Sequence, residues 1–171
     1  MTTAATFQGN KPDHVKEQRV ARFAGVIIGV FTLLWAFLLL ADVGGHILAA
    51  GPLQVATLSL SLVSALIVFF YCRALNYRTS AAGLLCFVAV AFFFADVALG
   101  FNYSPYFGVA VLAWGASARR PFLAGAGVLA ICAAIVAKYE HSLAGVAVAG
   151  VGLIILAMAL AIRPKNPPDW H

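Results

Sequence analysis

The spacing of long apolar runs constrains this chain more than any other feature of its sequence. Four runs have the length of a membrane span, and they cover Phe23–Ala41, Leu53–Leu75, Ala81–Phe101 and Leu143–Ile162. A helix needs about 20 mostly apolar residues to cross the hydrocarbon core of a bilayer. Because no water is present there, a spanning segment must satisfy its own backbone polar groups, as an α-helix does. We therefore expect an all-α integral membrane protein.

The composition excludes the soluble alternatives. Apolar residues make up 63% of the 171 residues and charged residues only 10%, whereas a soluble domain carries about 45–50% and about 25%. A soluble protein of this size exposes too much surface to hide such an excess of apolar residues. We therefore expect the lipid bilayer as a partner, and no nucleic acid.

The stretch from residue 103 to residue 137 decides how many spans there are. Arg119, Arg120 and Pro121 split it into two shorter apolar pieces, Tyr103–Ala118 and Pro121–Ala137. These pieces are either two short helices or one span plus a re-entrant segment. Cytoplasmic loops carry an excess of Lys and Arg. With two helices here, Lys138 is the one residue among the 11 Lys and Arg that falls outside, so this arrangement is favoured.

The resulting fold is a bundle of six transmembrane helices arranged as three antiparallel hairpins, with both termini in the cytoplasm. Residues 1–22 form a basic cytoplasmic N-terminal tail, residues 23–162 the transmembrane domain, and residues 163–171 a Pro-rich cytoplasmic C-terminal tail. The compact loops and the charge bias favour a bacterial inner membrane. In layout, the three hairpins resemble the small acid-resistance proteins of the HdeD type and the membrane part of DesK-like histidine kinases. This resemblance implies no residue roles.

Acidic residues mark the outer ends of three predicted helices. Asp42 and Glu140 lie at the boundary, where a solvated helix end is the simpler interpretation. Asp96 differs because apolar sequence continues after it as far as Phe101. An ionisable residue inside a span is a candidate functional residue, and the alternative is a packed helix-end acid. The candidate polar cluster, in which the basic residues and histidines are possible partners of Asp96, comprises Asp42, His46, Asp96, Lys138, Glu140 and His141.

Two further patterns concern the helix faces. Thr57, Ser61 and Ser64 share one face of the second span. They either line a polar path or form hydrogen bonds between helices. Small residues also recur at helical spacing, where they let helices approach closely. The candidate packing positions are Gly25 and Gly29 in the first span, and Gly145 with Ala149 in the last.

No pattern in the sequence indicates catalysis or a bound cofactor. Cys72, Cys86 and Cys132 occur singly, without the spacing of a metal site. His46 and His141 lie at the outer rim and not within an apolar span, so they are poorly placed to ligate a haem. Motifs of hydrolases, metalloproteases and nucleotide-binding enzymes are absent from the sequence. We expect no catalytic residue, no metal and no cofactor.

Three functions remain open. The first is a non-catalytic accessory or structural subunit that packs against other membrane proteins or against copies of itself. The second is a small-solute, ion or proton transporter or channel that uses Asp96. The third is a sensor of outside pH or of the state of the bilayer.

Overall fold

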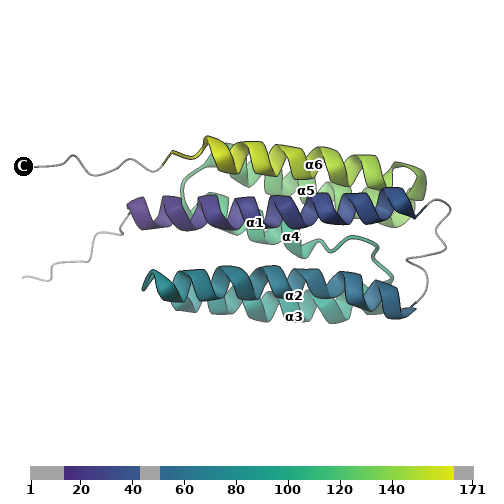
Figure 1. Cartoon of the computed structure of the whole chain (residues 1–171), viewed down its shortest axis with the longest axis horizontal. Coiled ribbons are helices and arrows are strands. Elements are labelled where there is room, and N and C mark those ends of the chain that lie inside the picture. The colour runs from purple at the N-terminus through teal and green to yellow at the C-terminus, as the bar shows by residue number, and fades with distance from the viewer. Residues whose placement is uncertain (1–13, 43–50, 164–171) are drawn as a thin grey trace, which may run out of the picture.

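The structure is a computed structural model, and it describes residues 14–42 and 51–163 (Figure 1). These residues form helices joined by short connections, and no strand occurs among them. The helices are α1 (His14–Ala41), α2 (Gly51–Ala74), α3 (Thr79–Leu99), α4 (Tyr106–Ser117), α5 (Pro121–Tyr139) and α6 (His141–Ala161).

Five of these helices, all except α4, are long and apolar enough to cross a membrane. This confirms the expectation of an all-helical chain built from several membrane-length helices. Their length and composition indicate an integral membrane protein. α1 begins at His14, well before the apolar run that starts at Phe23, so the basic residues Arg19 and Arg22 belong to its first turns.

α4 contains only 12 residues, so it is shorter than the span expected from Tyr103 to Ala118. Residues 100–105, which we call the α3–α4 link, are not helical. Gly100 ends α3 with φ at 67°, in the left-handed region, and this conformation favours glycine. Pro105 then restricts Ser104 to extended conformations, so helix cannot resume before α4.

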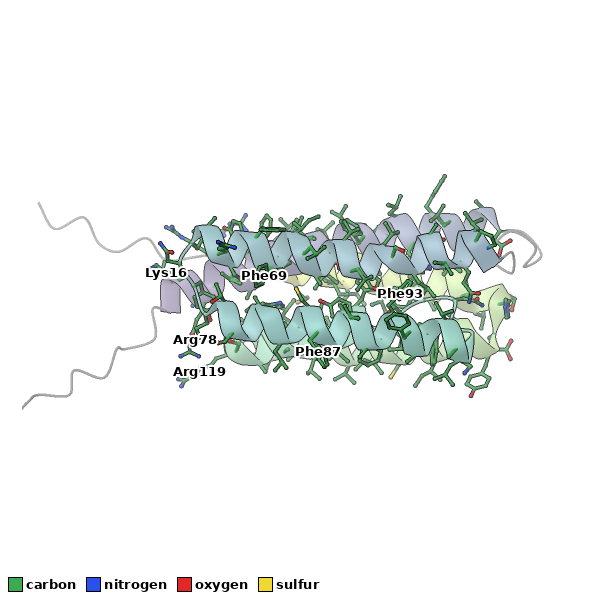
Figure 2. The ribbon with its side chains drawn as sticks, turned by 90° about the horizontal axis from the view of Figure 1, so that it is seen from below. Lys16, Phe69, Arg78, Phe87, Phe93 and Arg119 are labelled. Atoms are coloured by element: carbon green, nitrogen blue, oxygen red, sulfur yellow. The ribbon has the colours of Figure 1, made fainter. Side chains whose placement is uncertain are left out.

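The six helices lie side by side along one long axis (Figure 1). α1, α5 and α6 lie together on one side, α2 and α3 pair on the other, and α4 lies between the two groups. Lys16, Arg78 and Arg119 gather at one end of the bundle, which we call the arginine end (Figure 2). Asp96 lies near the end of α3, toward the opposite end, which we call the Asp96 end.

Glycines bring α1 and α6 into close contact. A Cβ atom added at Gly25 would lie 2.7 Å from the Cβ of Ala159, and one at Gly29 would lie 3.2 Å from the Cβ of Leu156. On α6, a Cβ added at Gly145 would lie 2.6 Å from the Cδ2 of Leu40. Ala149, also on α6, is half-buried. Three of the four candidate packing positions therefore line the contact between α1 and α6.

The contact between α4 and α5 is closer still, because there the two backbones touch. A Cβ added at Gly108 would lie 2.7 Å from the carbonyl oxygen of Gly127. One added at Gly127 would overlap the backbone nitrogen of Leu112. Since backbone atoms cannot move aside as a flexible side chain can, these glycines hold the short α4 against α5.

We expect Gly127→Ala to lower the free energy of unfolding by about 1–3 kcal/mol, the usual cost of overpacking a well-packed contact. Gly125→Ala is the matched control, since a Cβ at Gly125 meets no atom within 4 Å and alanine is the better helix former. Thermal unfolding of the detergent-solubilised protein measures both. Equal stability of the two variants would contradict the backbone contact between α4 and α5.

Candidate functional site

Asp96 is the buried acid of the Asp96 end. Its side chain is only 1% exposed, although it lies on the last turn of α3. The side chain of Ser104 is placed to hydrogen-bond with this carboxyl group. Its Oδ2 atom is fully buried and has no hydrogen-bond partner. Among the described residues that are not exposed, no other fully buried side-chain oxygen or nitrogen atom lacks a partner. Buried polar atoms are nearly always hydrogen-bonded, because desolvation is otherwise uncompensated. The burial of Oδ2 is therefore not compensated by any hydrogen bond from the described residues.

Ser104 connects this carboxyl group to the start of α4. The serine is fully buried, and its Oγ accepts a hydrogen bond of 3.2 Å from the backbone N–H of Tyr106. Its carbonyl oxygen accepts a second, of 3.3 Å, from the N–H of Phe107. The first N–H groups of a helix carry a partial positive charge. The hydroxyl of Ser104 therefore lies between the Asp96 carboxyl group and the positive end of α4.

Side chains of two other helices satisfy the backbone of the α3–α4 link. The indole Nε1 of Trp35 donates a 2.6 Å hydrogen bond to the carbonyl oxygen of Asn102. The amide of Gln54 donates a 3.2 Å bond to the carbonyl oxygen of Phe101. Non-helical backbone at membrane depth is tolerated only where protein or water satisfies it. Trp35 and Gln54 therefore allow this segment to lie within the bundle.

Aromatic rings exclude water from the same region. Tyr103 stacks on Phe107 with ring centroids 5.5 Å apart, and Trp35 meets both rings edge-on at 5.9 Å. The Tyr103 hydroxyl is 3.2 Å from that of Thr32, and both residues are fully buried. Hydrogen bonds and ring contacts together fix the link against α1.

The residues of the candidate polar cluster do not come together at one site in the structure. Lys138 places its ammonium group 4.5 Å from the ring centroid of Phe101, and His141 has its Nε2 3.0 Å from the Nδ2 of Asn102. Both therefore contact the α3–α4 link, whereas the partner of Asp96 is Ser104. Glu140 is exposed between α5 and α6, and Asp42 follows the end of α1. His46 lies outside the described residues.

The three hydroxyl residues of the candidate polar path on α2 are buried, and each donates to the backbone of its own helix. Thr57 donates to the carbonyl of Leu53 at 2.6 Å. Ser61 and Ser64 donate to carbonyl groups three residues earlier, at 2.7 and 2.8 Å. A cavity of about 10 Å³ lies beside Ser64 and Tyr106, close to the smallest volume that holds one water molecule.

Sequence reasoning missed most of the residues that surround Asp96. The signal was the sequence Asn102-Tyr103-Ser104-Pro105, in which polar residues and a proline interrupt two apolar runs. The contributions of Trp35 and Gln54 depend on contacts between distant helices and leave no local pattern.

No family model matches the chain, and comparisons with curated proteins and with solved structures give no significant match. The fold and the site define its class on their own: a helical membrane protein with a buried carboxyl group beside a non-helical segment.

We expect Ser104→Ala to destabilise the protein by about 1–3 kcal/mol, because it removes a partner from a buried carboxyl group and from the N–H of Tyr106. Ser59→Ala is the matched control, since the Ser59 hydroxyl donates only to the carbonyl of Val55 in its own helix. Thermal unfolding in detergent compares the two. If Ser104→Ala is no less stable than Ser59→Ala, Ser104 does not support the site.

Proposed function

We propose that this protein is a small proton transporter or channel in which the carboxyl group of Asp96 binds the proton. The observation that carries the proposal is the unpartnered Oδ2 of this buried side chain. Ionisable residues inside membrane bundles are rare and mark the paths of protons, ions or substrates.

A proton is the smallest ligand that fits the site. A bound proton turns Oδ2 into a donor or an uncharged acceptor, and this lowers the cost of burying it. A calcium or magnesium ion needs several oxygen ligands. The described residues contain no group of three or more His, Cys, Asp or Glu side chains that could hold a metal ion. The chemistry of the site therefore favours proton binding.

We also propose that the chain crosses the membrane six times, with the α3–α4 link and α4 as the fourth crossing. The link begins beside His141 at the Asp96 end, whereas Arg119, which follows α4, lies at the arginine end (Figure 2). The 12 residues of α4 extend about 18 Å. A hydrocarbon core is about 30 Å thick, so the non-helical α3–α4 link has to supply the rest of the crossing. Transporters place their binding sites at such discontinuous helices.

The same proposal sets the orientation. With the arginine end in the cytoplasm, the chain obeys the positive-inside rule, and both termini are cytoplasmic. A bacterial inner membrane fits this orientation, and Asp96 then lies toward the outer face.

Protons would reach the site from water at the outer face. His141 is exposed, and it contacts Asn102 of the α3–α4 link. The two ring nitrogens of an imidazole can accept and donate a proton, so a histidine can relay one. We therefore place the outer entrance of the proton path at His141 and Asn102.

A second candidate is the accessory subunit, which one feature of α3 favours. Only 17% of the residues in its apolar stretch are buried, against 39% in each other membrane-length helix described. Phe87 and Phe94 are 71% and 67% exposed on this helix. Aromatic side chains are enriched where protein interfaces form, so α3 is the helix best suited to contact another membrane protein.

Asp96→Asn tests proton transport. The amide keeps the size of the side chain but cannot exchange a proton, so we expect proton flux into liposomes to fall to the level of empty vesicles. Asp42→Asn, at the end of α1, is the matched control and should retain the flux of the unmodified protein. A fluorescent pH indicator inside the liposomes reports the rate under an imposed pH gradient. The proposal fails if the unmodified protein carries no flux, or if Asp96→Asn carries as much as Asp42→Asn.

A photoreactive phenylalanine at position 87 tests the accessory subunit. We expect it to crosslink a second polypeptide in native membranes. The same group at Val146, which is 64% exposed on α6, is the control and should give lipid adducts only. Lipid adducts alone at both positions would exclude a partner protein on α3.

A further inference from the structure

A cleft of about 480 Å³ lies along α1 at the arginine end of the bundle. It is far from Asp96 along the long axis, and the proton site uses none of its residues. Its lining consists of Arg19, Arg22, Phe23, Val26, Tyr71 and Leu160, which come from α1, α2 and α6.

Two guanidinium groups supply the charge of this cleft. Arg19 and Arg22 lie three residues apart, so they share one face of α1. Arg19 is exposed and Arg22 is half-buried, and none of the residues that line the cleft is acidic. Arginine matches the geometry of phosphate because its planar group donates two parallel hydrogen bonds. The part of the cleft lined by Arg19 and Arg22 is therefore suited to a phosphate group.

The remaining walls are apolar. The ring of Phe23 stacks on that of Tyr71, with centroids 3.8 Å apart and planes 17° apart. This pair joins α1 to α2 on one side, and Leu160 of α6 contributes to the lining as well. Val26 and the exposed Val30 continue the face of Arg19 and Arg22 toward the middle of the bundle. Over about 16 Å of helix, this face thus changes from cationic to apolar.

We propose that this cleft binds an anionic phospholipid, with its phosphate group on Arg19 and Arg22 and an acyl chain along Val26 and Val30. The cleft combines two arginines with an apolar groove that is open to the bilayer. A matching ligand therefore carries an anionic group and a long apolar tail. Basic pockets between membrane helices near the surface bind anionic headgroups in this way. Inorganic phosphate has the charge but lacks the tail. The proposal depends on the chain lying in a membrane and not on proton transport.

Native mass spectrometry of the full chain, released from mixed vesicles of phosphatidylglycerol and phosphatidylcholine with identical acyl chains, tests the proposal. The double variant Arg19→Gln/Arg22→Gln removes both guanidinium groups. The matched control, Arg73→Gln/Arg163→Gln, removes two exposed arginines that do not line the cleft.

We expect the unmodified protein and the control to retain phosphatidylglycerol in preference to phosphatidylcholine. The affinity of the cleft variant for phosphatidylglycerol should fall by about tenfold or more, because charge-assisted contacts to the phosphate group are lost. Equal loss in both double variants would overturn the proposal, since it would indicate general surface charge. Complete displacement of the lipid by inorganic phosphate would also overturn it, because the site would then recognise the anion alone. Thermal unfolding of each variant in neutral detergent verifies that the fold is retained.

Discussion

The Trp35 indole donates a 2.6 Å hydrogen bond to the carbonyl oxygen of Asn102, where the helical hydrogen bonding of the chain is interrupted. Lipid cannot supply such a partner to a backbone group. Gln54 donates in the same way to the carbonyl oxygen of Phe101, and the rings of Tyr103 and Phe107 pack around these bonds. Without these contacts, the link between α3 and α4 would leave unsatisfied backbone groups in an apolar interior. The fourth segment can therefore be short and irregular because α1 and α2 supply the partners that its own backbone lacks.

This irregular link also explains why Asp96 can be buried. Asp96 lies within α3, and the chain that follows Leu99 folds back over it and brings Ser104 against it, which a continued helix would not do. The glycine contacts between α4 and α5 hold the far side of the site in place. The fold thus places Ser104 beside the carboxyl group and leaves its Oδ2 atom without a hydrogen-bond partner. A site that satisfies only half of a buried acid is suited to bind and release a proton.

The sequence predicted the helices better than the site. Long apolar runs predicted the membrane-length helices because hydrophobic length is a local property, and small residues at helical spacing indicated where α1 and α6 approach each other. Asp96 was recognised because apolar sequence continues beyond it. Its partner was not, since Lys138 and His141 lie at a similar depth but contact Phe101 and Asn102 instead. Depth along a helix can be counted from sequence, whereas the direction in which a side chain points depends on how the helices pack.

The infrared spectrum of the protein in nanodiscs tests most directly whether Asp96 binds a proton. A neutral carboxylic acid has a carbonyl stretch that an ionised carboxylate lacks, and isotopic labelling of aspartate identifies it. The account predicts that lowering the pH produces an aspartic acid band, and that Asp96→Asn removes this band while Asp42→Asn does not. If the band is unchanged in Asp96→Asn, or absent at every pH at which the protein stays folded, Asp96 is not the proton-binding group.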